Sequence, residues 1–310
     1  MSIVVIGSSN SDMVVTVPHI PVPGETVMGA DFQIYKGGKG ANQAVAAARS
    51  GGEVTFIANI GSDELGDAAI ENFKKEHINT VYIVRDKGRS GVALIMVSNK
   101  GENSIAVSPE SNALLTPAHI EACADVLRQA NIILVQLEIP LETVIKIGEL
   151  ARKYKVKFIL NPAPAQSLPE QLLKNVSIIT PNETEASLLT NVEVKDIDSA
   201  KQAAQYLLTL GIEQIIITLG EKGALLATGS DFYHFPAYNI KAIDTTAAGD
   251  IFNGVLTESL IAGNDIKTAV AYANAAGALS ATLPGAQNAA PSRTAIVDFM
   301  RLYKNETNKV

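Results

Sequence analysis

Short runs of consecutive apolar residues alternate along the chain with longer stretches whose apolar residues recur at helical spacing. These patterns predict, in order, strand 3–7, helix 41–51, strand 54–60, helix 65–76, strand 132–137, helix 141–154, strand 157–161, strand 176–180, helix 183–190 and strand 214–218. Runs without a polar residue, such as 132–135, are typical of parallel strands with helices on both faces. We therefore predict an α/β protein with a Rossmann-like three-layer α/β/α core and a mostly parallel sheet.

Two segments break this alternation. Residues 13–36 contain two strand-like runs separated by prolines and a glycine, and residues 90–108 contain two more, joined by a turn-forming sequence. Neither segment has a helical pattern. We expect their four strands to form a small, mostly antiparallel β-sheet that projects from a core made of residues 1–12, 37–89 and 109–310.

Composition and charge exclude several classes of protein. Lys and Arg number 25 against 32 Asp and Glu, a net charge of −7, and no dense basic run is present, so nucleic-acid binding has no electrostatic basis. The single cysteine, Cys123, excludes an internal disulfide and fits a reducing compartment. No apolar run approaches the roughly 20 residues that a membrane-spanning helix needs. We expect a cytoplasmic protein without nucleic-acid or membrane partners.

The strongest chemical signal lies at residues 244–250, Asp-Thr-Thr-Ala-Ala-Gly-Asp, just before an apolar helical stretch. The small residues Ala247, Ala248 and Gly249 let backbone N–H groups converge at a helix N-terminus, which attracts an anion. Asp250 adds a negative charge at the same place. That charge makes sense if Asp250 accepts a proton from a hydroxyl that attacks a phosphorus atom. The alternative is that Asp250 only caps the helix.

Polar residues also follow two of the predicted buried strands. Asn10 and Asp12 come after the strand 3–7, and Glu138 follows the strand 132–137. In α/β proteins, ligands usually bind at the carboxyl ends of strands. An Asn and an Asp two residues apart can hold neighbouring hydroxyl groups there, although a turn capped by these side chains is the alternative. The Glu138 carboxylate is expensive to bury unless it is paired or faces a pocket.

A glycine-rich block lies at residues 37–46, where Gly37, Gly38 and Gly40 permit close approach of the backbone to a ligand. The block lacks the P-loop order of Gly, four residues and Gly-Lys-Ser/Thr, which disfavours a Walker-type nucleotidase. It also lacks Gly-x-Gly-x-x-Gly, so a dinucleotide-dependent dehydrogenase has no support.

Together these segments resemble, in order, the motifs of the ribokinase family of carbohydrate and nucleoside kinases. The matching motifs lie at 10–12, 37–46, 135–138, 161–165, 180–185, 218–223 and 244–250 and cover nearly the whole chain. The resemblance implies that the small sheet is a lid over a sugar and a homodimer surface. It also implies that Asp250 is the general base, with Ala247, Ala248 and Gly249 as the anion hole. The implied sugar-binding residues are Asn10, Asp12, Gly38, Lys39, Asn42, Glu138 and Asp250.

The nucleotide side follows from the same resemblance. The implied nucleotide-binding residues are Asn182, Thr218, Gly220, Glu221, Lys222, Gly223, Gly249 and Asn274. Glu185 would order Mg²⁺ through water, since carboxylates and waters usually hold Mg²⁺ beside a phosphate. From the residues alone, Asn182 and Glu185 could instead form the first turn of a helix, where negative charge is favoured.

The family is also activated by a monovalent cation, usually K⁺, which mostly backbone oxygens bind beside the anion hole. The matching positions here are Asp244, Thr246, Ser280, Leu283, Gly285 and Ala289. Ala289 departs from the pattern, because a serine hydroxyl commonly contributes there. The site should persist on its carbonyl groups with a changed affinity.

The resemblance therefore implies an enzyme that uses ATP and Mg²⁺, with K⁺ as activator, to phosphorylate D-ribose at its 5-hydroxyl. The alternatives are a kinase of the same fold for 2-deoxyribose or a purine nucleoside, and a sugar sensor without transfer activity. An intact Asp250 and anion hole speak against the sensor, which has no use for either.

Overall fold

The computed structural model describes residues 2–303 and 308–309 of the chain. Its main sheet has nine strands. The parallel part has the order β4 (Glu53–Ile57), β1 (Ser2–Ile6), β9 (Ile132–Val135), β10 (Lys157–Leu160), β11 (Ile178–Ile179) and β12 (Gln214–Thr218). Antiparallel neighbours follow, β13 (Ala224–Thr228), β14 (Asp231–Phe235) and β15 (Asn308–Lys309). The predicted mostly parallel sheet is confirmed.

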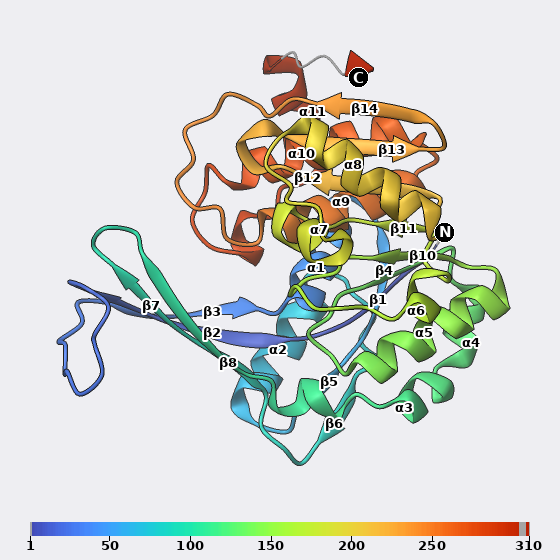
Figure 1. Cartoon of the computed structure of the whole chain (residues 1–310). Coiled ribbons are helices and arrows are strands. Elements are labelled where there is room, and N and C mark those ends of the chain that lie inside the picture. The colour runs from blue at the N-terminus through green and yellow to red at the C-terminus, as the bar shows by residue number, and fades with distance from the viewer. Residues whose placement is uncertain (1, 304–307, 310) are drawn as a thin grey trace.

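Alternate residues of the parallel strands pack on opposite faces of this sheet, and each face is covered by helices (Figure 1). Ile3 and Val5 of β1 belong to one apolar core, which includes α1 (Lys39–Arg49), α2 (Glu64–Lys75), α9 (Ala248–Ile261), α10 (Ile266–Ser280) and α11 (Arg293–Leu302). Val4 and Ile6 belong to the other, which includes α3 (Pro117–Ala122), α4 (Ala124–Gln129), α5 (Leu141–Tyr154), α6 (Glu170–Leu173), α7 (Glu183–Thr190) and α8 (Ile197–Thr209). The unbroken apolar strands thus give the predicted three layers.

A second sheet of four strands extends away from this core, to the left in Figure 1. Its order is β3 (Phe32–Gly37), β2 (Asn10–Val17), β7 (Gly91–Ser98) and β8 (Asn103–Ser108). The outer pairs are antiparallel and the central pair β2–β7 is parallel. We call these four strands the small sheet.

The structure differs from the sequence prediction in two places that matter for the site. The run 54–60, expected as one strand, is divided at Ala58, because β5 (Asn59–Gly61) leaves the main sheet to pair with β6 (Val84–Asp86). The strand β2 already begins at Asn10, since Asn10 pairs with Gly37 and Gly91. Asn10 and Asp12 therefore lie on the small sheet and not in a turn. In the described part of the chain no helix has both the length and the apolar character needed to cross a membrane.

Candidate active site

A cleft of about 210 Å³ lies where the parallel strands end and the helices α1 and α9 begin. It collects residues that are far apart in the sequence, which is the usual ligand position in open α/β sheets. Its lining residues are Lys39, Asn161, Ala163, Thr180, Asn182, Glu185, Thr218, Thr245, Ala247, Ala248, Gly249, Asp250 and Asn253. The structure thus brings the predicted anion hole together with several predicted nucleotide residues.

The start of α9 is built by a sharp turn in the backbone. Ala247 is the N-cap and has a left-handed conformation with φ 59° and ψ 10°, which is uncommon for a residue other than glycine. The N–H group of Ala248 donates to the carbonyl of Thr245 (3.2 Å). Gly249 and Asp250 follow in the first helical turn, where backbone N–H groups lack partners within the helix. A methyl group built on Gly249 would meet no protein atom within 4 Å, so the cleft is open above this residue.

Asp250 is nearly buried, with 6% of its surface exposed, and its two carboxylate oxygens have different partners. The amide of Asn42 donates to Oδ2 (3.0 Å) and the amide of Gln43 donates to Oδ1 (2.9 Å). Lys39 is the nearby cation, and the negative charge of Asp250 is the largest cause of a raised pKa for the Lys39 ammonium group. The carboxylate therefore faces two neutral donors and one positive charge.

The predicted sugar residues gather around Lys39. The charges of Asp12, Glu138 and Asp250 all act on its ammonium group. Burial, followed by the negative charges of Glu138 and Asp250, raises the pKa of Asp12 to about 6, and Lys39 opposes this shift. Four charged side chains, from β2, the segment after β9, α1 and α9, thus form one cluster. Several carboxylates around one cation suit a neutral ligand rich in hydroxyl donors.

Glu138 has a second task, which explains how its carboxylate is tolerated. Its Oε2 accepts hydrogen bonds from the hydroxyl of Ser8 (2.5 Å) and from the backbone N–H of Lys39 (3.0 Å). The N-cap of α1 is Gly38, with φ 88° and no side chain to cap the helix. Glu138 therefore supplies, from the segment after β9, an acceptor like the one that a serine or aspartate N-cap would give.

Asn10 is oriented by a residue that the sequence analysis missed. The amide of Asn112, in the turn η1 (Glu110–Leu114), donates to Asn10 Oδ1 (2.7 Å), and Asn112 Oδ1 accepts from the backbone N–H of Ser9 (2.9 Å). With its oxygen engaged, Asn10 has its amide N–H groups left for a ligand. Asn112 reaches Asn10 because the chain returns from the small sheet at this point. No local sequence pattern therefore identifies Asn112 as a site residue.

On the nucleotide side, Asn182 and Glu185 do form the first turn of a helix. Asn182 is the N-cap of α7 and accepts from the N–H of Glu185 (2.8 Å), while Glu185 accepts from the N–H of Asn182 (2.9 Å). Both also line the cleft. Burial is the main cause of a raised pKa for Glu185. Capping and ligand binding are therefore compatible for this pair.

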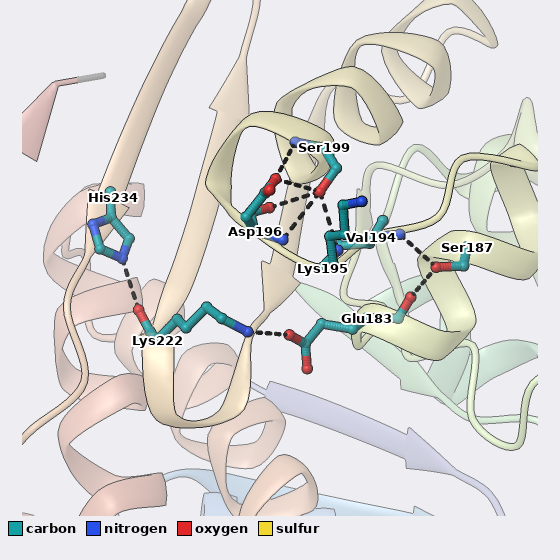
Figure 2. Close-up of polar contacts among 8 residues, drawn as sticks. All are labelled: Glu183, Ser187, Val194, Lys195, Asp196, Ser199, Lys222 and His234. Atoms are coloured by element: carbon teal, nitrogen blue, oxygen red, sulfur yellow. Dashed lines mark hydrogen bonds and ion pairs between the residues drawn. The ribbon is translucent and has the colours of Figure 1, made fainter.

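The predicted nucleotide loop forms the short 3₁₀ helix η2 (Gly220–Lys222), and polar contacts of Lys222 connect it to α7 and β14 (Figure 2). Lys222 Nζ pairs with Glu183 on α7 (3.1 Å), and His234 on β14 bonds the Lys222 carbonyl (2.7 Å). Thr218 forms an isolated parallel β-bridge with Asn182 and lines the cleft. The other residues predicted in this loop are not among the residues that line the cleft: Gly220, Glu221, Lys222 and Gly223. Asn274 also lies outside this lining, and its amide donates to the Pro236 carbonyl (2.8 Å).

The residues present fit weakly held cations. Among the described residues no group of three or more His, Cys, Asp and Glu could hold a metal. Glu185 is thus suited to assist Mg²⁺ that the phosphates themselves bind. For K⁺, the Asp244 carboxylate draws two loops together by accepting from the N–H groups of Thr246 (2.9 Å) and Gly285 (2.8 Å). Ser280 is the last residue of α10, and its carbonyl accepts from the N–H of Leu283 on the second loop (3.0 Å). Ala289, further along the chain, is buried.

Comparisons with known proteins agree with this geometry. The pattern of the pfkB family carbohydrate kinases matches residues 1–293. The chain belongs to this family. It is 42% identical over 300 residues to the ribokinase of Haemophilus influenzae, which covers 96% of this chain and 98% of that protein. It is also 37% identical over 304 residues to the deoxyribokinase of Salmonella typhi, covering 97% and 99%.

Among solved structures, Arabidopsis thaliana ribokinase complexed with ribose and ATP superposes on the chain with a TM-score of 0.91. The two are 28% identical, and the match covers 96% of this chain and 98% of that one. The predicted family and fold class are confirmed.

Proposed function

We propose that the protein transfers the γ-phosphoryl group of ATP to the 5-hydroxyl of D-ribose, giving D-ribose 5-phosphate and ADP. The observation that carries this proposal is the position of Asp250. Its carboxylate lies at the start of α9, in the wall of the cleft and within reach of the Asp12 and Lys39 charges. One carboxylate thus joins a site for phosphates to a site for hydroxyl groups.

In this proposal each part of the site has one task. Asn10 and Asp12 hold ribose hydroxyls, and Asp250 accepts the proton of the 5-hydroxyl as it attacks phosphorus. Backbone N–H groups at the start of α9 stabilise the charge that develops on the transferred group. Mg²⁺, assisted by Glu185, would neutralise phosphate charge. Asn42 Oδ1 is buried and has no hydrogen-bond partner among the described residues, which suits a sugar hydroxyl as donor.

The related ribokinases support ribose as the substrate, and a related deoxyribokinase makes 2-deoxyribose the second candidate. The ribokinase of Haemophilus influenzae is 42% identical, and the deoxyribokinase of Salmonella typhi is 37% identical. Ribose and 2-deoxyribose differ by one hydroxyl, so most contacts of the site serve both. A coupled assay of ADP release should compare ribose, 2-deoxyribose, fructose and adenosine. We expect the highest kcat/KM for ribose. A higher value for 2-deoxyribose would make 2-deoxyribose the preferred substrate, and no ADP release with any of the four compounds would refute the proposal.

Asp250→Asn tests the role of the base in the same assay. The amide cannot accept the proton, and the loss of a general base typically lowers turnover about 10²–10⁴-fold. Ribose affinity, measured by calorimetry, should change little because the amide keeps the size of the carboxylate. A variant that retains more than about a tenth of the wild-type kcat would show that Asp250 is not the base.

We further propose that the small sheet closes over the sugar and forms a homodimer with a second copy of the chain. Five large apolar side chains of the small sheet are more than half exposed, Phe32, Ile34 and Leu94 on one of its faces and Ile105 and Val107 on the other. Exposed apolar side chains gathered on one element indicate a surface that another protein covers. We also propose that K⁺ activates the enzyme and that it acts in the cytoplasm, where a single unpaired cysteine is stable.

A further inference from the structure

A chain of buried amide groups leads from the main sheet to the carboxylate of Asp250. Gln43 is fully buried in the first turns of α1, and its Nε2 donates both to Asp250 Oδ1 (2.9 Å) and to Asn161 Oδ1 (3.0 Å). Its Oε1 accepts from the amide of Gln136 (2.6 Å), a fully buried residue that directly follows β9. Gln43 is therefore held at both ends of its amide.

These contacts fix which end of the Gln43 amide faces Asp250. Asn161 uses its own amide N–H on the carbonyl of Thr180 (3.1 Å), so its oxygen is left to accept from Gln43. If Gln43 turned over, its oxygen would face the oxygens of Asp250 and Asn161, and its nitrogen would face the nitrogen of Gln136. The observed orientation gives partners to both ends of the Gln43 amide and to the facing oxygens of Asp250 and Asn161, and it points N–H groups at the carboxylate.

Glycines in the neighbouring elements make this arrangement possible. A methyl group on Gly254 of α9 would lie 2.5 Å from the carbonyl oxygen of Gln43, so Gly254 lets α9 pack closely on α1. A methyl group on Gly7 would collide with Gln136 Oε1. The backbone thus leaves room for both glutamines beside the base.

We propose that Gln43 is a positioning residue for Asp250, which holds its carboxylate in the ionised form and in a fixed orientation, and that Gln136 sets the direction of the Gln43 amide. This inference rests on the proposed role of Asp250. Hydrogen bonds to an ionised carboxylate favour that form over the protonated one. An amide donates without adding a charge and does not titrate, so the base is kept ready over a wide pH range and remains able to accept a proton.

Other groups near Asp250 act on it by charge and not by this hydrogen bond. Lys39 of α1 is a positive charge near Asp250, and Asp12 of β2 and Glu185 of α7 are negative charges near it. Glu138, which follows β9, contacts the backbone N–H of Lys39 and the hydroxyl of Ser8. Replacing Gln43 with a neutral residue leaves these charges in place, so the effect of the amide can be measured separately.

The test is the pH dependence of phosphoryl transfer in a single turnover with ribose and ATP bound. In Gln43→Met, a side chain of similar size lacks the donor, and the ionised base is less stable. We expect the acidic limb of the rate profile to move to higher pH by about one unit, the size of effect that one hydrogen bond to a carboxylate has. Gln136→Met leaves Asp250 untouched but frees the Gln43 amide, so it should move the limb in the same direction by less.

Thr257→Val is the matched control. Thr257 is fully buried on the same helix as Asp250, and its hydroxyl donates to the backbone carbonyl of Asn253 (2.8 Å). Its profile should overlay that of the wild type. If either glutamine variant fails to fold, as judged by circular dichroism, the other still tests the proposal.

An unshifted limb in the folded glutamine variants would overturn the proposal, even if their rates were lower at every pH, because a merely structural role slows the reaction at all pH values alike. Failure of this inference is distinct from failure of the proposed function. In the first case wild-type protein still releases ADP with ribose and Asp250→Asn does not; in the second, wild-type protein releases none.

Discussion

At the scale of single residues, the carboxylates of the site differ in their hydrogen-bond donors and in the charges around them. Asp250 is met by two amides, whereas Asp12 lies among other carboxylates. Glu138 is engaged by a hydroxyl and by a backbone N–H. Burial and the neighbouring negative charges raise the pKa of Asp12, so this carboxyl is easier to protonate than an ordinary aspartate.

Ribose binding should depend on pH through Asp12. Its pKa is raised to about 6, and an ionised carboxylate accepts more hydroxyl hydrogen bonds than a protonated one. As the pH falls through 6 the carboxyl becomes protonated, so the affinity for ribose should decrease, by up to about tenfold per pH unit, and should level off above pH 7. Calorimetric titration between about pH 5 and pH 8 measures this. Asp12→Asn should bind weakly at every pH, and a flat wild-type profile would contradict the assignment.

At the scale of elements, α9 combines close packing on one side with an open cleft on the other. Gly254 faces α1, where a methyl group would meet the Gln43 carbonyl oxygen at 2.5 Å. Gly249 faces open space at the helix start. The two glycines thus lack a side chain for different reasons. Gly254 allows α9 to pack closely on α1, and Gly249 leaves the cleft open.

Alanine substitutions should separate these reasons. Gly254→Ala forces α9 from α1, so we expect a loss of about 1–3 kcal/mol in the free energy of unfolding, together with lower activity. Gly249→Ala meets no protein atom and adds a better helix former, so stability should be kept. Its added methyl group would enter the phosphate space and lower kcat/KM for ATP. Denaturant unfolding and the ADP assay measure both; full activity in Gly249→Ala would exclude close approach of phosphate to this residue.

At the scale of the whole molecule, distant segments converge beside the start of α9. Asp244 joins the loops on either side of α9 and α10 by bonding Thr246 and Gly285. Arg49 at the end of α1 bonds the carbonyls of Gln287 (2.6 Å) and Ala290 (3.1 Å) and so fixes the segment that carries Ala289. A cation bound there would act on the loop that leads into Asp250.

We expect K⁺ to raise kcat relative to Na⁺ or to no added cation. Ala289 offers no hydroxyl, so half-saturation should occur at higher K⁺ than in Ala289→Ser, with similar maximal activation. Titration of both proteins with KCl at constant ionic strength tests this. Absence of activation in both would remove the cation site, and identical curves would show that the hydroxyl has no effect.

Dimer formation should depend on the small sheet. Ile105 on β8 is 54% exposed, and Ile105→Lys would place a charge in the proposed interface. We expect a dimer for the wild type and a monomer for this variant in light scattering after size exclusion. Tyr206→Lys is the control, because Tyr206 is 45% exposed on α8, which is not part of the small sheet. A monomeric wild type, or two dimeric variants, would contradict the proposed interface.

The sequence by itself determined the layers of this protein and the identity of its central motif. Short unbroken apolar runs are typical of strands covered on both faces, so the pattern of residues 132–135 and its equivalents predicted the parallel sheet. The small residues before Asp250 likewise marked a helix start that could hold an anion. Both are local signals, in which neighbours along the chain carry the information.

Only the tertiary structure decided which side chains act together. Asn42 and Asp250 are 208 positions apart, and Ser9 and Asn112 are 103 apart. Local patterns do not indicate that Glu138 bonds the start of α1, that β2 begins at Asn10, or that the Gln43 amide bonds Asp250. Such contacts arise when strands and helices of remote segments pack, and the orientation of an amide is set by all of its partners at once. A pattern of single residues records the elements, whereas the hydrogen bonds of the site belong to the packed molecule.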